Sequence, residues 1–389
     1  MNDDKKSKEE KFPRRDKHPY YIWDSIMVIP EILRACQGEE VSGQVQQVLK
    51  NMEQKKIDNI ILLGTESSYF VAITERYAFE KYTGIPTQSF LTTEFSQYPP
   101  LTLNNHSAVF FHSHSGSTLG DMEAIDVVRK AGGYSVGVTN IPDSILAKNT
   151  DDVIIGPGGA KAALPATRAY TAALFRMMML VVELGKIRKP NSDLLEFESH
   201  LNTLPDVLEK VSQVCAEKSP GIIDQVKDCS AFILVGAGPN HPTVEEGTLS
   251  FYQSTGKSAK AYKLENYLHG PMQALQPNMC VILVGAPGPL QPRLLQTAEA
   301  CQIIGAKVVL LVPEGSDVGF NPDVLLEIPA DLPEMLTPLI YITPLWQLAY
   351  YYSLLGRSDV HTDRLSMDKP EFKKAFAMVM SGDGKFVKE

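Results

Sequence analysis

The sequence Phe110-Phe111-His112-Ser113-His114-Ser115-Gly116-Ser117-Thr118 passes from a run of apolar residues into a series of small hydroxyl residues. Residues 107–111 are short, apolar and partly β-branched, which is typical of a strand buried in a parallel sheet. Residues 121–131 carry apolar side chains at helical spacing. The sequence between them is therefore predicted to be a turn from a strand into a helix.

A turn of this kind directs backbone N–H groups and the positive end of a helix dipole into one place. Ser113, Ser115, Ser117 and Thr118 add hydroxyl donors around that place. A phosphate is the ligand that these donors fit best. The same residues also fit a plain Ser/Thr helix cap in which Gly116 relieves the turn, so both interpretations stay open here.

Composition limits the class of protein and its partners. A chain of 389 residues is long enough for two or three domains. The net charge of −9 and the pI of about 5.5, without a basic stripe, disfavour nucleic acid as a partner. No apolar run reaches the roughly 18 residues of a membrane span, and residues 1–17 lack the apolar core of a secretion signal. We therefore expect a cytoplasmic protein without a membrane partner.

Neither a metal nor an organic cofactor is expected. The five cysteines are scattered without CxxC spacing, which argues against zinc and favours reduced, buried thiols: Cys36, Cys215, Cys229, Cys280 and Cys301. Gly236-Ala237-Gly238 resembles part of a dinucleotide fingerprint, but no third glycine follows at the required spacing. NAD is therefore not expected to bind.

A second strand, turn and helix precede the first. Residues 57–63 form an apolar run that ends in Gly64-Thr65-Glu66-Ser67-Ser68, and residues 69–82 return to helical spacing. Further strands are predicted at residues 87–90, 134–139 and 151–155, and a long helix at residues 169–183. This alternation indicates a parallel α/β sheet. Ligands of such sheets bind beyond the carboxyl ends of the strands, where both serine turns should lie.

The second half of the chain repeats this organisation. After a helical segment at residues 192–218, strands are predicted at residues 231–235, 280–284, 307–311 and 324–328. Helices are predicted between them at residues 244–253 and 290–304, with an aromatic-rich helix at residues 338–355. A repeat of roughly 160 residues is too long for a solenoid unit and implies two homologous α/β domains.

Several motifs resemble those of one family. The segments Gly64-Thr65-Glu66-Ser67-Ser68-Tyr69, Ser113-His114-Ser115-Gly116-Ser117-Thr118 and Ala166-Thr167-Arg168-Ala169-Tyr170-Thr171 resemble, in order and spacing, the pattern of sugar isomerase (SIS) domains. Glu246-Gly247-Thr248-Leu249 and Leu268-His269-Gly270-Pro271 resemble elements in the isomerase half of glucosamine-6-phosphate synthase. Arg364-Leu365-Ser366-Met367-Asp368-Lys369 is similar to the tail of the fructosamine-6-phosphate deglycases. The likeness covers about residues 18–375.

The resemblance implies two SIS domains, each a flavodoxin-like parallel sheet between two helical layers. We expect a disordered charged tail at residues 1–17, a first domain with an N-terminal docking segment at 18–195, and a second domain at 196–356. A tail at 357–389 should complete the site. The family likeness assigns the phosphate to five residues: Ser68, Ser113, His114, Ser115 and Thr118. Ser67 is a further candidate for the substrate site.

Two positions depart from the family pattern within the first site. His114 stands where the family often has Gln, and Glu66 stands where it often has Gly. These substitutions could add a positive and a negative charge beside the same turn. They point to an altered substrate.

The reacting end of the site is sought in the second half. Moving a proton between C1 and C2 of a sugar requires a group that exchanges protons near neutral pH and a base. By resemblance, His269 opens the sugar ring and Lys369 reaches the sugar. The imidazole suits its role because its ordinary pKa lies near 6.5. A structural histidine in a loop and a solvated lysine in a tail fit the same sequence.

The glutamate that resemblance assigns as the catalytic base is absent from this sequence. The position that matches the family glutamate is Gln253, which cannot act as a base. Three explanations stay open. Glu265 could act as the base, or Glu245 or Glu246 could act as the base. Alternatively, the protein binds the sugar phosphate but has lost the enolisation step. Glu265 is favoured because it lies close to His269 in sequence. Glu245 and Glu246 also suit a helix start, where the dipole stabilises carboxylates.

The sequence thus predicts a cofactor-free enzyme that binds a sugar phosphate or its amine conjugate. A deglycase that cleaves fructosamine-6-phosphate-type conjugates to a hexose 6-phosphate and an amine is the leading hypothesis. An aldose–ketose isomerase and a non-catalytic sugar-phosphate sensor are the alternatives. Since no glutaminase domain is recognised in the sequence, amidotransfer is not expected. The resemblance implies a homodimer or higher oligomer, with the aromatic residues 20–23 and 346–352 as contact surfaces.

Overall fold

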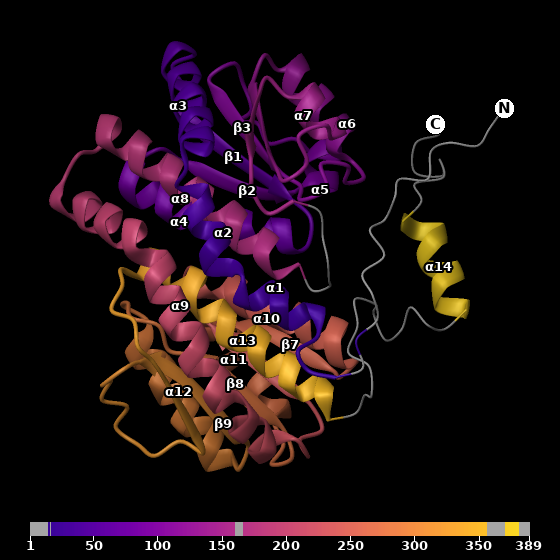
Figure 1. The fold of residues 1–389 in the computed structure, drawn as a ribbon, viewed down its shortest axis with the longest axis vertical. Helices are drawn as coiled ribbons and strands as arrows, with labels where there is room; N and C mark the ends of the chain where they lie inside the picture. The colour runs from indigo at the N-terminus through magenta and orange to yellow at the C-terminus, as the bar shows by residue number, and fades with distance from the viewer. Residues whose placement is uncertain (1–14, 16, 160–165, 356–369, 381–389) are drawn as a thin grey trace.

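The computed structural model describes residues 15, 17–159, 166–355 and 370–380, and it contains two five-stranded parallel sheets (Figure 1). The first sheet has the order β2-β1-β3-β4-β5, with β1 Asn59–Gly64, β2 Thr87–Leu91, β3 Ser107–His112, β4 Tyr134–Thr139 and β5 Asp152–Ile155. The second has the order β10-β9-β8-β6-β7, with β6 Phe232–Gly236, β7 Ala259–Lys263, β8 Cys280–Val284, β9 Lys307–Pro313 and β10 Val324–Ile328. The predicted pair of parallel α/β domains is confirmed.

Helices cover both faces of the first sheet. One layer contains α3 Glu39–Gln54, α4 Ser67–Thr83 and α8 Thr167–Arg188, and the other contains α5 Thr92–Gln97, α6 Asp121–Lys130 and α7 Ile145–Asn149. Strand β1 shows how the sequence divides its side chains between these layers. Ile60 and Leu62 pack into the core that contains α4 and α8, whereas Ile61 and Leu63 pack against α5 and α6. Burial of both faces explains the uninterrupted apolar strands.

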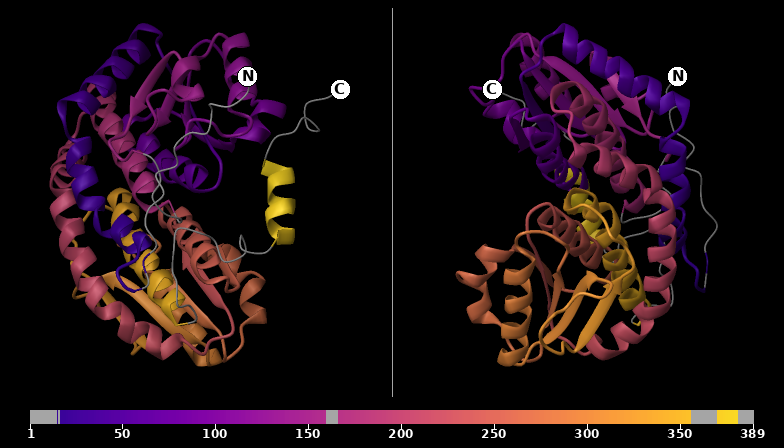
Figure 2. Two further views of the ribbon diagram at one scale, coloured as in Figure 1. Left: turned by 45° about the vertical axis from the view of Figure 1, so that its right-hand side comes forward. Right: turned by 90° about the vertical axis from the view of Figure 1, so that its left-hand side faces the viewer.

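The second domain has the same layers. Its sheet packs on one side against α9 Ser192–Val226, α10 Asn240–Thr255 and α13 Thr337–Leu354, and on the other against α11 Leu264–Leu268 and α12 Gln291–Ile304. Two 3₁₀ turns are η1 Pro271–Ala274 and η2 Glu334–Leu336. Figure 2 shows α9 running from one domain to the other. The inner faces of both sheets contribute to one apolar core, which includes Phe110 from β3 and Ile282 from β8.

The N-terminal segment forms two short helices, α1 Tyr21–Met27 and α2 Ile29–Cys36, that pack against α8. Pro30 lies in the first turn of α2, where its missing N–H leaves no helical hydrogen bond unmade. The aromatic residues 20–23 and 346–352, which we expected to form subunit contacts, are mostly packed within the chain itself. Trp23 packs against Tyr350 with ring centroids 5.1 Å apart, and Trp346 is 1% exposed. These rings complete the core of the chain itself.

The remaining differences from the predicted elements lie at exposed or polar segments. Helix α9 continues eight residues beyond the predicted end at residue 218, with Pro205 and Pro220 inside it, and it contains the predicted domain boundary at residue 195. Edge strand β7 was not predicted, because exposed Lys260 and Lys263 interrupt its apolar pattern. Helix α14 Pro370–Met380 lies in the predicted tail. All five cysteines are buried free thiols, as predicted.

Within the described ranges, none of the helices is long and apolar enough to cross a membrane.

Gly64 fixes how closely β1 approaches α4. A Cβ atom at this position would collide with the backbone of Ser68 in the first turn of the helix. We expect G64A to lower the melting temperature by about 4 °C or more, because a backbone contact cannot relax by changing a rotamer. Thermal unfolding followed by circular dichroism measures this change.

G43A is the matched control for this experiment. Gly43 lies within α3, and a Cβ atom there would meet nothing within 4 Å. The G43A variant should unfold at or slightly above the wild-type temperature, because Ala favours a helix more than Gly. Equal melting temperatures for G64A and G43A would contradict the close approach of β1 and α4.

Candidate functional site

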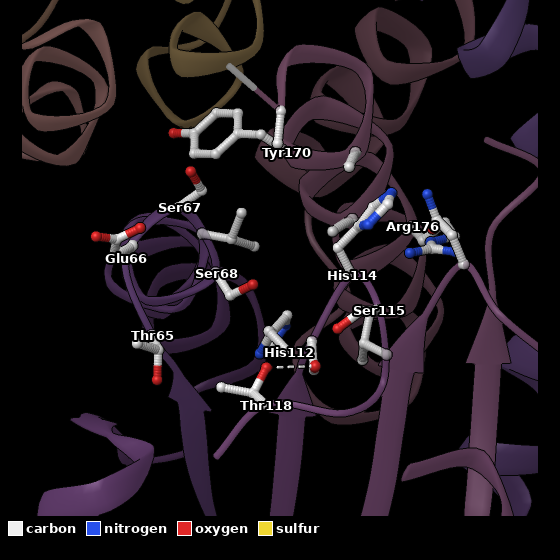
Figure 3. Close-up of a pocket in the computed structure, with 17 residues that line it drawn as sticks. Thr65, Glu66, Ser67, Ser68, His112, His114, Ser115, Thr118, Tyr170 and Arg176 are labelled. Atoms are coloured by element: carbon white, nitrogen blue, oxygen red, sulfur yellow. Dashed lines mark hydrogen bonds between the residues drawn. The ribbon is translucent and has the colours of Figure 1, made fainter. Parts of the chain in front are cut away.

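A pocket of about 130 Å³ opens at the carboxyl ends of β1 and β3 (Figure 3). Its walls come from the first turn of α4, the loop after β3 and the N-terminal half of α8. The five residues that the sequence assigned to a phosphate all line it: Ser68, Ser113, His114, Ser115 and Thr118. Ser67 and Glu66 line it too. The two serine turns, about 45 residues apart in sequence, therefore share one cavity, as parallel strand order requires.

Hydrogen bonds within the loop after β3 fix its hydroxyl groups. The Oγ of Ser113 lies 2.7 Å from the Oγ1 of Thr118, and the Thr118 backbone N–H donates to Oδ2 of Asp121 over 3.1 Å. Gly116 adopts a φ of 62°, and a Cβ atom there would collide with Ser144. This conformation and the lack of space require glycine at the centre of the loop.

The helix terminus at the pocket belongs to α4. The sequence predicted that the helix after the serine loop would direct its dipole at the site, but α6 begins at Asp121, beyond the lining residues. The first turn of α4 lines the pocket instead, because β1 passes into it over only two residues. Glu66, the residue before α4, has a φ of 51°, a backbone angle that residues other than Gly seldom adopt. The positive end of the α4 dipole thus faces the cavity.

The lining residue His112 is paired with a buried acid, Glu75, which does not itself line the pocket. The Nδ1 of His112 lies 3.0 Å from the Leu63 carbonyl oxygen, which can only accept, so Nδ1 carries a hydrogen. The Nε2 of His112 lies 2.9 Å from Oε1 of Glu75, and both side chains are almost fully buried. Burial raises the pKa of Glu75, and the neighbouring His112 opposes that rise.

Arg176 is a lining residue that was not predicted from the sequence. It lies in α8, is 1% exposed, and donates from Nη1 to the carbonyl of Thr139 over 3.2 Å. Burial lowers the pKa of Arg176 to about 10, so the guanidinium stays charged at neutral pH. The signal available in the sequence was an arginine within the apolar run of residues 174–182. A charged residue seldom occupies a fully buried helix face without a partner.

Tyr170 connects the pocket to the second domain. Its ring lines the cavity, and burial raises the pKa of its hydroxyl, an effect that the charge of Glu246 increases. Glu246 lies in α10 and is fully buried. Helix α10 packs against α4 at this junction of the two domains. The predicted substrate residue Glu246 therefore approaches the pocket from the far domain, through the hydroxyl end of Tyr170.

The residues predicted to react with the sugar do not line this pocket. His269 follows α11, its side chain is 78% exposed, and its Nε2 lies 3.4 Å from Oε2 of Glu265. Glu265 also accepts a hydrogen bond from Nε of Arg293 over 3.1 Å, and Arg293 lowers the pKa of that carboxyl group. A carboxylate held in this way is a weakened base. Gln253 lies near the end of α10, and Lys369 lies outside the described residues.

The corresponding edge of the second sheet carries a carboxylate. Gly238 follows β6 and Gly288 follows β8, which occupy the places of β1 and β3 in the strand order. A Cβ atom on Gly288 would collide with the carboxylate of Glu334, and one on Gly238 would lie 3.2 Å from it. Burial raises the pKa of Glu334. An acidic side chain thus stands where the first domain has its open pocket.

The described part of the chain offers no group of three or more His, Cys, Asp or Glu side chains that could hold a metal ion.

The chain has two parallel-sheet domains that share a helical core, with a hydroxyl-lined pocket at the strand ends of the first. Residues 53–183 match the family described as "SIS domain". Isomerizing glutamine–fructose-6-phosphate aminotransferase from Pyrococcus horikoshii is 26% identical over 320 residues, which cover 82% of this chain and 52% of that protein. The chain thus spans about half the length of this curated relative.

Solved structures share the whole arrangement. The C-terminal domain of glucosamine-fructose-6-phosphate aminotransferase from Francisella tularensis matches with a TM-score of 0.79 at 21% identity, over 89% of this chain and 99% of that chain. Tagatose-6-phosphate ketose/aldose isomerase from Escherichia coli matches with a TM-score of 0.74 at 16% identity, over 90% and 98%. The chain therefore carries a SIS domain in its first half and has the two-domain fold of these structures.

The pKa of Asp121 provides a test of the loop geometry. Burial raises this pKa to about 7, although the Thr118 N–H and Ser113 stabilise the charged form. An unfolded aspartate ionises near pH 4, so between these values the folded protein binds more protons than the unfolded chain. Stability from this group is therefore present at low pH and is lost as the pH rises towards 7.

We expect the melting temperature of the wild type to fall relative to that of D121N, by about 3 °C or more, between pH 5 and pH 8. The asparagine side chain retains an oxygen acceptor for the Thr118 N–H but does not ionise. Differential scanning calorimetry of both proteins across this range measures the difference. Parallel curves would show that Asp121 is already ionised in the folded protein at pH 5.

Proposed function

We propose that the protein binds a sugar phosphate with its phosphate group in the pocket between β1, β3 and α4. The observation that carries this proposal is the convergence of hydroxyl groups, a helix N-terminus and a buried guanidinium on one small cavity. Hydroxyl and backbone donors at a helix N-terminus suit a phosphate. The solved structures with this fold include an isomerase of a ketose 6-phosphate, tagatose 6-phosphate, which supports the same ligand class.

We further propose that the protein is a deglycase. In this reaction a fructosamine-6-phosphate-type conjugate undergoes proton transfer at C1 and C2, and water then releases the amine and leaves a hexose 6-phosphate. The Arg364–Lys369 tail motif and His269 support this reaction through their family likeness. The altered lining at Glu66 and His114 supports a substrate other than an unmodified ketose phosphate. Aldose–ketose isomerisation remains the second enzymatic candidate.

The exposure of His269 supports a homodimer. Its imidazole lies outside the phosphate pocket of its own chain, while its side chain is 78% exposed. We propose that a second copy of the chain brings its His269 to the sugar, as the resemblance to SIS proteins implies. Among the candidate bases, Glu246 acts electrostatically on Tyr170, a lining residue of the pocket, whereas Glu265 accepts a hydrogen bond from Arg293.

Substrate turnover separates the enzyme from a sensor. We expect the purified protein to release free amino acid from fructosamine 6-phosphates, because the phosphate pocket and His269 would hold and open the sugar. Amine release measured by chromatography, with the unphosphorylated fructosamines as control, tests this expectation. Measurable binding without turnover of any conjugate would favour the sensor, for which Gln253 in place of the family glutamate is the supporting observation.

Substitution of the loop serines tests the phosphate position. We expect S113A and S115A each to weaken the binding of fructose 6-phosphate by about 1–3 kcal/mol, the range for a hydrogen bond to a charged group. Isothermal titration calorimetry measures the affinity. The control is S192A, at the exposed start of α9, which should bind like the wild type. Unchanged affinity in both loop variants would place the ligand elsewhere.

A further inference from the structure

We propose that Arg176 makes the pocket selective for the dianionic phosphate ester, by supplying a buried counter-charge that no neutral ligand can use. This inference rests on the proposed function and extends it to a residue outside the serine loops. Arg176 is the cation with the deepest position in the lining, being 1% exposed, whereas the hydroxyl donors carry no charge.

The guanidinium has no acidic partner in the described part of the chain. None of the salt bridges among the described residues includes it, and the titratable group that acts on it is the buried thiol of Cys36. One hydrogen bond leads from Nη1 to the Thr139 carbonyl, and the Nε–H has no acceptor. A guanidinium has five N–H donors, so donors remain available for a ligand. Buried charges in proteins are normally paired, and an unpaired one marks a site for an opposite charge.

The surroundings of Arg176 hold its charge beside the serine loop. A Cβ atom on Gly156 would collide with the guanidinium, so the group packs directly against bare backbone. Thr139, which accepts the hydrogen bond from Arg176, donates through its Oγ1 to the carbonyl of His114 over 3.1 Å. Thr139 therefore links the guanidinium to the backbone of His114. Figure 3 shows the side chains of Arg176 and His114 at the same end of the pocket.

Among the described residues, no other arginine or lysine lines the pocket. The Nε2 of His112 lies 2.9 Å from Oε1 of Glu75, so this carboxylate would offset a positive charge on the imidazole. Glu66 is exposed at the rim and has the wrong sign for an anion. Low solvent access strengthens the attraction between a buried guanidinium and a phosphate. The serine hydroxyls would therefore position the phosphate, while Arg176 discriminates by charge.

The test compares R176M, R176K and wild type for binding of fructose 6-phosphate, inorganic phosphate and unphosphorylated fructose by calorimetry. R176M, which keeps the apolar stem, should lose at least tenfold in affinity for both phosphates, and R176K should recover part of that loss. The control R129M removes an exposed arginine of α6 and should bind within twofold of the wild type. Affinity in R176M equal to that of the wild type would overturn the inference and leave the proposed function intact.

The stability of the ligand-free variants separates a ligand-directed arginine from a structural one. Because R176M removes an unpaired buried charge, it should melt at or above the wild-type temperature without ligand, and phosphate should raise its melting temperature less. A fall of several degrees in ligand-free R176M, with the phosphate-induced shift retained, would make Arg176 structural and overturn the inference. A wild type that binds neither phosphate would overturn both the proposed function and this inference.

Discussion

The shared helical core between the two sheets is the constraint on which the rest of the structure depends. Helices α4, α8, α10 and α13 bury apolar side chains between the inner faces of both sheets, so the two domains form one continuous core. This packing carries the first turn of α4 to the ends of β1 and β3, and it brings α10 against α4. The pocket is therefore formed by elements whose positions are fixed by hydrophobic burial, which is non-directional but tolerates few voids.

The tightly packed elements around the pocket also bury several ionisable side chains that have few partners inside the protein. The Glu75–His112 pair, Asp121 and Arg176 are all nearly excluded from water, and burial shifts the pKa values of Glu75, Asp121 and Arg176 away from their ordinary ranges. Groups of this kind lower the stability of an apolar core unless a ligand or a partner offsets them. Their concentration around one cavity distinguishes it from the matching edge of the second sheet, where Glu334 stands beside the turn glycines.

The parts of the site that depend on local sequence were predictable, and the parts that depend on tertiary packing were not. The serine turns at Ser68 and Ser113 were found because each follows a buried strand, and parallel strands end at one edge. Arg176 and Tyr170 were missed because the pattern of apolar residues in α8 does not indicate which face of the helix lines a pocket. The aromatic residues 20–23 and 346–352 were assigned to a subunit contact because sequence hydrophobicity does not distinguish an interface from a core.

By itself, the sequence determined the parallel α/β class, the repeat of two domains and the serine loops, because strand alternation, helical spacing and turn chemistry act over a few residues. Edge strand β7 and helix α14 were not predictable in this way, since exposed polar residues weaken both patterns. Tertiary structure alone decided that α4 rather than α6 presents its N-terminus to the pocket, that Arg176 lies buried beside the loop, and that His269 is exposed away from it. Those outcomes depend on contacts between residues far apart in the chain, which only the packed core brings together.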